Sequence, residues 1–274
     1  MKAVVFGDLH SRRFKCEELF KSIGLMAEDG TRNEGFHVIS LGDVVSLGYD
    51  EQECDFLHFV EPFIDEWLLG NHEVPAIWWN GELDFMGWDM DPWHGWHIGR
   101  DREAEQLVRA KFMRGEYKTA TTLGKWLITH AGVSIRHQKK NEFNKMSVED
   151  VATRLNSMFL ECLEERKNIP VISDCGQHTG GIFWLRPEYL TPGYNLQNHL
   201  PQIIGHTGNV GPCLYGDAVW LIDTPGDRIT RDKGGVCALV TEDNGENFDV
   251  HWVKAGTNEV VVNEFFKRRT GAPY

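Results

Sequence analysis

The chain has no apolar run that approaches the roughly 20 residues of a membrane-spanning helix. Its N-terminus has no Lys/Arg segment followed by a hydrophobic stretch, which is the pattern of a secretory signal. It also lacks internal repeats of solenoid length and segments of low complexity. We therefore expect a cytoplasmic protein without a membrane partner, with a single domain over all 274 residues.

Paired cysteines and a surplus of positive charge are also missing. The six cysteines form no Cys-x-x-Cys motif, which argues against a zinc ribbon or a redox pair and favours reduced, structural thiols. With 28 basic and 41 acidic residues, the formal net charge is −13, which argues against broad binding to duplex DNA. A phosphate group bound locally remains compatible with this charge.

Five apolar, strand-like runs end in residues that could bind a metal ion. The run 2–6 is followed by Gly7, Asp8 and His10. The other four lead to Asp43, to Asn71 and His72, to His130, and to His206. A glycine usually stands beside the polar residue, where it lets the backbone turn sharply and approach a ligand. One such turn is most often only a polar loop, but five in one chain indicate a shared site.

The first third of the chain alternates between strand and helix patterns. Strands are predicted at 2–6, 36–41 and 64–69, and helices at 14–23 and 51–60. This order predicts parallel strands with right-handed crossovers, which would bring the polar residues after each strand to one edge of a sheet.

Further elements are predicted in the rest of the chain. Helices are expected at 101–113 and from Ser147 to about residue 167, and strands at 125–128, 202–205, 218–222, 236–241 and 249–253. The strand-rich later half predicts a second sheet packed on the first. The aromatic and basic tail at 265–269 is expected to be an exposed terminus, with a docking contact as the alternative.

Residues 74–122 interrupt the alternation with a tryptophan-rich insertion. It holds five of the ten tryptophans: Trp78, Trp79, Trp88, Trp93 and Trp96. We favour a packed surface insertion anchored by the indoles; the alternative is a cap over the site whose rings bind a base or another flat group. His94 and His97 could bind a metal, although such histidines are more often surface or packing residues.

Taken in order, five motifs resemble those of the calcineurin-like metallophosphoesterases. They are Gly7-Asp8-Leu9-His10, Gly42-Asp43, Gly70-Asn71-His72-Glu73, His130-Ala131-Gly132 and Gly205-His206-Thr207. Because Gly208 stands where other branches have a second histidine, the last motif resembles the phosphoprotein-phosphatase and diadenosine-tetraphosphatase branch of phages and bacteria. The resemblance implies an α/β fold, a four-layer α/β/β/α sandwich of two mixed sheets with helices outside.

The resemblance also implies a dinuclear metal site. The first divalent ion would be held by Asp8, His10 and Asp43, and the second by Asp43, Asn71, His130 and His206. Such a pair activates water for in-line attack on phosphorus, and His72 would protonate the leaving oxygen as general acid. Carboxylate, amide and imidazole ligands suit Mn²⁺, the ion we expect, and also iron or Zn²⁺.

Two positions depart from the phosphatase pattern Gly-Asp-x-x-Asp-Arg-Gly. Ser46 replaces the aspartate that would orient His72, for which Glu73 or Asp50 could substitute, and Leu47 replaces an arginine that would hold phosphate. The segment Trp184-Leu185-Arg186 resembles one that contacts phosphate in bacterial and phage relatives, so Arg186 is the predicted phosphate ligand. Arg100 and Arg102 are competitors, more simply explained as solvated charges near a helix start.

The leading hypothesis is a metal-dependent phosphoesterase acting on a small phosphomonoester, a nucleotide or a dinucleoside polyphosphate. The tryptophans motivate the nucleotide option. The missing arginine at Leu47 makes a serine/threonine phosphoprotein phosphatase the alternative. A catalytically weak metal-binding scaffold is a further alternative, against which the retained His72 counts. Processing of single-stranded nucleic-acid ends stays open, whereas the −13 charge argues against duplex substrates.

Overall fold

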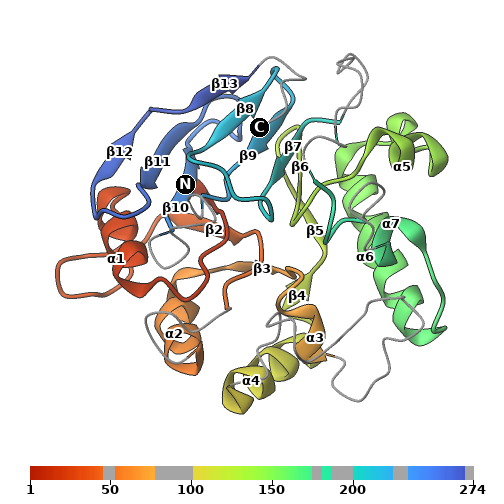
Figure 1. Cartoon of the computed structure of the whole chain (residues 1–274), viewed down its shortest axis with the longest axis horizontal. Helices are drawn as coiled ribbons and strands as arrows, with labels where there is room; N and C mark the ends of the chain where they lie inside the picture. Colours follow the sequence, from red (N-terminus) through yellow and green to blue (C-terminus); the bar gives the residue numbers. More distant parts are fainter. Residues whose placement is uncertain are drawn as a thin grey trace.

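The computed structural model describes residues 1–45, 53–77, 101–174, 181–186, 190, 200–224 and 234–268. Two mixed β-sheets form its centre (Figure 1). The strands of the first sheet are β1 (Lys2–Phe6), β2 (Phe36–Ser40), β3 (Glu66–Leu68), β4 (Tyr117–Lys118), β10 (Val236–Thr241), β11 (Asp249–Val253) and β12 (Val260–Val262). Their order is β12-β11-β10-β1-β2-β3-β4. The run from β1 to β4 is parallel, as the strand–helix alternation predicted, and β10, β11 and β12 are antiparallel.

The second sheet is built mostly from the middle of the chain. Its strands are β5 (Ala120–Leu123), β6 (Trp126–Thr129), β7 (Gln202–Ile204), β8 (Cys213–Tyr215), β9 (Val219–Leu221) and β13 (Phe266–Arg268), in the order β13-β8-β9-β7-β6-β5. The neighbours β6, β7 and β9 are parallel to one another. This sheet therefore also has an edge where several strands end together.

Helices cover the outer faces of both sheets. They are α1 (Arg13–Ser22), α2 (Glu53–Val60), α3 (Val74–Ile77), α4 (Arg102–Met113), α5 (Ile135–Lys140), α6 (Val148–Glu164) and α7 (Pro170–Ser173), with 3-10 turns η1 (Glu61–Phe63) and η4 (Phe143–Lys145). Helix α1 packs on β10 and β11, whereas α6 packs on β5 and β6, on the opposite side of the molecule (Figure 1). The predicted sandwich of two mixed sheets between helices is confirmed.

The pleat of β1 explains the layers. Successive side chains of a strand point to opposite faces. Val4 and Phe6 join the core beneath the helices, where the Phe6 and Phe20 rings lie 4.8 Å apart, centroid to centroid. Val5 points the other way, into the apolar layer between the sheets that also contains Ile128. One short strand thus contributes to both interfaces of the sandwich.

The predicted starts of two helices are supported by side-chain caps. Ser147 Oγ accepts a hydrogen bond from the backbone N–H of Asp150 at 3.1 Å, at the start of α6. Asp101 Oδ1 accepts from the backbone N–H groups of Glu103 and Ala104, at the start of α4. These bonds satisfy donors that the first turn of a helix leaves unpaired.

For the later half, one expectation is wrong and another is incomplete. The predicted strands β10 and β11 do not belong to the second sheet, because β10 pairs with β1, with Leu239 opposite Val5. All six residues of β10 are buried, so this strand needs neighbours at both edges and layers on both faces. The tail is exposed at Phe266 and Lys267, as expected, but it also docks on the second sheet, since β13 pairs with β8 and the rings of Phe265 and Trp220 lie 4.9 Å apart.

The range 74–122 contributes strands β4 and β5 at its end, as well as α3 and α4. Its five tryptophans, His94, His97 and Arg100 lie outside the described residues. Within the described part of the chain, none of the helices is long and apolar enough to cross a lipid bilayer.

Candidate metal centre

The residues of the five motifs come together where strands of both sheets end. In the first sheet Phe6 lies opposite Ser40 and Ser40 opposite Trp67, so the loops after β1, β2 and β3 leave the sheet side by side. In the second sheet Ile128 lies opposite Ile203, which does the same for the loops after β6 and β7. The structure brings together all seven predicted residues: Asp8, His10, Asp43, Asn71, His72, His130 and His206. All are buried except His10, which is partly exposed.

Three of these residues hold left-handed backbone conformations that non-glycine residues rarely adopt. The φ angle is +48° at His10, +47° at Asp43 and +67° at His206. Such conformations cost about 1–3 kcal/mol each and cluster at functional sites. Glycines bring the chain close to the carboxylates: a Cβ at Gly205 would lie 2.0 Å from Asp8 Oδ1, and one at Gly70 2.1 Å from Asp43 Oδ1.

Four ligand-type atoms converge in one half of the site, here called the second half-site. Asn71 Oδ1 lies 2.9 Å from His130 Nε2 and 2.8 Å from His206 Nδ1. Asp43 Oδ2 lies 3.5 Å from His130 Nε2. These atoms come from loops after β2, β3, β6 and β7, so the half-site joins the two sheets.

The protonation of His130 shows what the second half-site can hold. Burial lowers the pKa of His130 to about 3, so its ring is neutral near pH 7 and carries one N–H. Nδ1 lies 3.0 Å from the carbonyl oxygen of Leu41, which can only accept, so Nδ1 donates there. Nε2 then presents a lone pair toward oxygens of Asn71 and Asp43, an arrangement that a cation between them would stabilise. Metal-binding histidines commonly donate their other N–H to a backbone carbonyl.

The first half-site consists of Asp8, His10 and Asp43. Asp8 Oδ2 accepts a hydrogen bond from the backbone N–H of His206 at 2.8 Å and lies 3.9 Å from His10 Nε2. Asp8 Oδ1 is buried and has no hydrogen-bond partner among the described residues. Asp43 reaches both half-sites, because it groups with His10 and His72 on one side and with His130 and His206 on the other.

The electrostatics of the site favour bound cations. Burial raises the pKa values of Asp8 and Asp43 well above their usual range, and repulsion from Asp223 and Glu73, respectively, adds to the effect. Burial also lowers the pKa values of His10 and His206. Divalent ions would stabilise ionised carboxylates and neutral imidazoles together. The donor set of carboxylate, amide oxygen and imidazole therefore fits two divalent metal ions that share Asp43.

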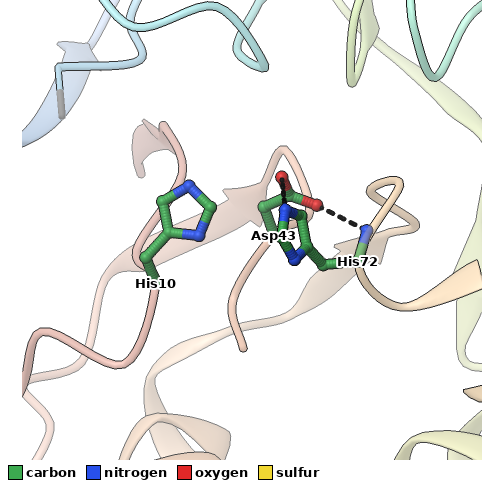
Figure 2. A group of neighbouring side chains, drawn as sticks. All are labelled: His10, Asp43 and His72. Atoms are coloured by element: carbon green, nitrogen blue, oxygen red, sulfur yellow. Dashed lines mark hydrogen bonds and ion pairs between the residues drawn. The ribbon is translucent and has the colours of Figure 1, made fainter. Parts of the chain in front are cut away.

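His72 is held against the shared carboxylate. Its backbone N–H donates to Asp43 Oδ1 at 3.0 Å, and its ring Nε2 lies 3.7 Å from Asp43 Oδ2 (Figure 2). The rings of His10 and His72 approach edge to face, with centroids 5.4 Å apart. His72 therefore lies beside both Asp43 and His10.

Glu73 has a role that the sequence did not reveal. Its Oε2 accepts from the backbone N–H groups of Asp43 at 2.8 Å and Gly70 at 2.9 Å, and its Oε1 accepts from those of Val44 at 2.9 Å and Val45 at 3.2 Å. The carboxylate thus clamps the loop after β2 to the loop after β3, rather than turning to the ring of His72. Ser46, Leu47 and Asp50 lie outside the described residues.

Arg186 lies beside the second half-site. Its Nη1 donates to Thr207 Oγ1 at 3.2 Å, next to His206 in the chain, and the indole ring of Trp184 packs edge to face on the His206 ring. The guanidinium is half-buried. Arg102 is exposed at the start of α4. Of the described arginines predicted to hold phosphate, Arg186 is the one placed at the site.

Asp223 belongs to the same group of residues, although it is not among the site residues predicted from the sequence. Its carboxylate lies close to Asp8 and His10, and burial raises its pKa to about 7. The signal was present: an apolar run, Val219–Leu221, leads within two residues to an aspartate, as in the other motifs.

A family model described as the calcineurin-like phosphoesterases matches residues 1–210 of the 274. The chain belongs to the calcineurin-like phosphoesterases. It is a hydrolase acting on phosphate esters, and the motifs identified in the sequence lie within the matched region. No curated protein matches the chain by sequence.

Solved structures share the fold of this phosphoesterase. A cold-active protein-tyrosine phosphatase of a psychrophilic Shewanella species aligns with a TM-score of 0.61 and 16% identity, over 96% of this chain and 80% of that one. A 1.1 Å structure of a cold-active protein tyrosine phosphatase gives a TM-score of 0.60 and 15% identity, over 96% and 79%. At these identities the likeness shows a common fold for the phosphoesterase.

Proposed function

We propose that this phosphoesterase uses a dinuclear metal centre and water to cleave its ester. Asp8, His10 and Asp43 would hold one divalent ion, and Asp43, Asn71, His130 and His206 the other. The observation that carries this proposal is the convergence of Asn71 Oδ1, at 2.9 Å, and Asp43 Oδ2, at 3.5 Å, on Nε2 of His130. When bound, such an ion pair supplies an activated water and stabilises the charge of the phosphoryl group.

His72 is proposed as the general acid that protonates the leaving oxygen. Its position supports this role, because its ring Nε2 lies 3.7 Å from Asp43 Oδ2, within the proposed centre. Proton transfer of this kind contributes roughly 10²- to 10⁴-fold to the rate. His72→Asn should therefore lower kcat by about that factor and leave the metal content unchanged. If the variant kept the wild-type kcat, another group would have to protonate the leaving oxygen.

Arg186 is proposed to hold the phosphate. Its half-buried guanidinium lies beside the His206 loop and is already positioned by Thr207. Loss of a charged hydrogen bond costs about 1.5–3 kcal/mol, so Arg186→Ala should raise KM for a phosphomonoester by roughly 10- to 100-fold. Arg186→Lys keeps the positive charge but cannot make the bidentate contact of a guanidinium. Its KM should therefore lie between those of the wild type and Arg186→Ala. Unchanged KM values in both variants would remove Arg186 from the site.

The proposed substrate is a small phosphomonoester, a nucleotide or a dinucleoside polyphosphate. The absence of an arginine at Leu47 argues against the phosphoprotein substrates of the related branch, and the net charge of −13 argues against long polyanions. A phosphoprotein phosphatase is the second candidate, because the structures of similar fold are named as protein phosphatases. Mn²⁺ as the metal and a cytoplasmic location are proposed from the sequence alone.

The test combines metal analysis with a substrate panel. Purified protein would be assayed with Mn²⁺ on a chromogenic phosphomonoester, its diester, a dinucleoside tetraphosphate and phosphotyrosine and phosphoserine peptides. Asp43→Asn should lose both metals and turnover, whereas Asp217→Asn makes the same change at an exposed turn and should lose neither. Two bound metals without hydrolysis of any substrate would support a scaffold instead. Turnover of phosphopeptides alone would move the assignment to the second candidate.

A further inference from the structure

Asp223 is placed at the metal centre by the register of the second sheet. β9 runs parallel to β7 with Leu221 opposite Ile204. Asp223 follows Leu221 by two residues, as His206 follows Ile204. Parallel strands in register deliver equivalent positions to the same edge, so Asp223 enters the site from the strand next to the one that carries His206.

The side chain of Asp223 faces the first half-site. Asp223, Asp8 and His10 each offer one ligand-type atom, and these atoms all lie within 4.8 Å of one another. Asp8 and Asp223 are each only 2% exposed, and Oδ1 of each is buried without a hydrogen-bond partner among the described residues. Two buried carboxylate oxygens without donors, beside an imidazole, are costly unless a cation binds them.

We propose that Asp223 is an additional ligand of the first metal ion, beside Asp8, His10 and Asp43. This inference rests on the dinuclear centre proposed above and adds a residue that its motifs do not contain. Three carboxylates and one imidazole make the first half-site rich in oxygen, whereas the second has two imidazoles, an amide and the shared carboxylate of Asp43. Hard oxygen ligands favour Mn²⁺ or Mg²⁺. The two half-sites therefore differ in metal preference, with the harder ion in the first.

A nearby arginine offsets part of the charge of a third carboxylate. Arg12 is buried and attracts both Asp8 and Asp223 electrostatically. Its Nη1 donates to the carbonyl oxygen of Gly235 at 3.1 Å, which helps to fix the guanidinium. Arg186 also attracts Asp223, so two arginines offset part of the negative charge that Asp8 and Asp223 bring to the first half-site. If Asp223 were a purely structural residue, it would serve only to pair with Arg12. The ligand role and the structural role predict different stabilities for metal-free variants of Asp223.

The test measures how Mn²⁺ binds to the metal-free chain. Binding is monitored by titration calorimetry and by the electron spin resonance signal of free Mn²⁺. Asp223→Asn should bind one ion with wild-type affinity and the other roughly 10- to 100-fold more weakly. Asp217→Asn, with the same charge change at an exposed turn, should bind both ions as the wild type does. Asp223→Asn that binds both ions within twofold of Asp217→Asn would overturn the proposal.

Thermal melts separate a ligand from a structural residue. A ligand role predicts that metal-free Asp223→Asn melts at or above the wild-type temperature, because a repelling charge is gone, and gains less on addition of Mn²⁺. Asp223→Ser removes the carboxylate without placing an amide beside Asp8, and it should behave as Asp223→Asn does. Unfolding of both metal-free variants would assign Asp223 to pairing with Arg12 and overturn the proposal. A wild type that binds no Mn²⁺ would overturn the dinuclear centre itself, and this inference with it.

Discussion

Gly205→Ala should damage the first half-site while the fold remains. A Cβ at this position would lie 2.0 Å from Asp8 Oδ1, whereas unbonded heavy atoms pack at about 3.5 Å. Either the carboxylate or the loop after β7 must therefore move by more than about 1 Å. Gly205 is not in the left-handed region, so alanine adds steric overlap and no backbone strain.

The size of the effect follows from that displacement. Overpacking of a buried position typically costs about 1–3 kcal/mol of unfolding free energy. A misplacement of about 1 Å can lower an enzyme's rate roughly 100-fold. Because Asp8 is a proposed ligand, we expect the affinity of one Mn²⁺ site to fall by roughly 10- to 100-fold as well. Denaturant unfolding of the metal-free protein and Mn²⁺ titration measure the two effects separately.

Gly115→Ala provides the matched control. Gly115 has a φ of +74°, and a Cβ added there would have no atom within 4 Å, so alanine costs about 1–2 kcal/mol through backbone strain alone. The two variants should lose similar stability, but only Gly205→Ala should lose metal affinity and turnover. If Gly205→Ala bound Mn²⁺ as tightly as Gly115→Ala, the close approach of Gly205 to Asp8 would have no functional role.

Two further predictions concern Glu73, which holds two loops together, and the pH dependence of metal binding. Glu73→Gln should lower the unfolding free energy by about 2–4 kcal/mol, because an amide can accept at only one of its two ends and leaves two of the four backbone N–H groups without an acceptor. Wild-type stability in denaturant would contradict this. Mn²⁺ binding should weaken as pH falls from about 7 and should release protons, because Asp8 and Asp43 have raised pKa values and Asp223 titrates at about 7. Calorimetry in two buffers of different ionisation enthalpy would show equal heats if no proton were released.

Much of the site could be predicted from the sequence because its residues follow strands. An apolar run that ends in Gly-Asp or Gly-Asn identifies both the strand and the polar residue beyond it. Parallel strands then bring these residues to one edge without further information, as the pairing of Phe6 with Ser40 and of Ser40 with Trp67 shows. Ser147 and Asp101 similarly marked helix starts, because capping depends only on neighbouring residues.

What could not be predicted depends on partners distant in the sequence. The six buried residues of β10 indicate a central strand but not its pairing with β1. Glu73 follows His72 directly and invites a role in catalysis, yet its oxygens bind four backbone N–H groups of loops that only the fold brings together. Asp223 has the same strand-then-aspartate pattern as the other motifs, but it comes after the last motif that the resemblance supplies.

The most direct test of the central claim is the number of Mn²⁺ ions bound per chain by the wild type, Asp43→Asn and Asp217→Asn. Asp43 contributes to both half-sites, and its Oδ2 lies 3.5 Å from His130 Nε2 and 3.7 Å from His72 Nε2. A dinuclear centre predicts two ions in the wild type and in Asp217→Asn, with both weakened together in Asp43→Asn. A wild type that binds no more than one ion, or an Asp43→Asn variant that still binds two with full affinity, would contradict it.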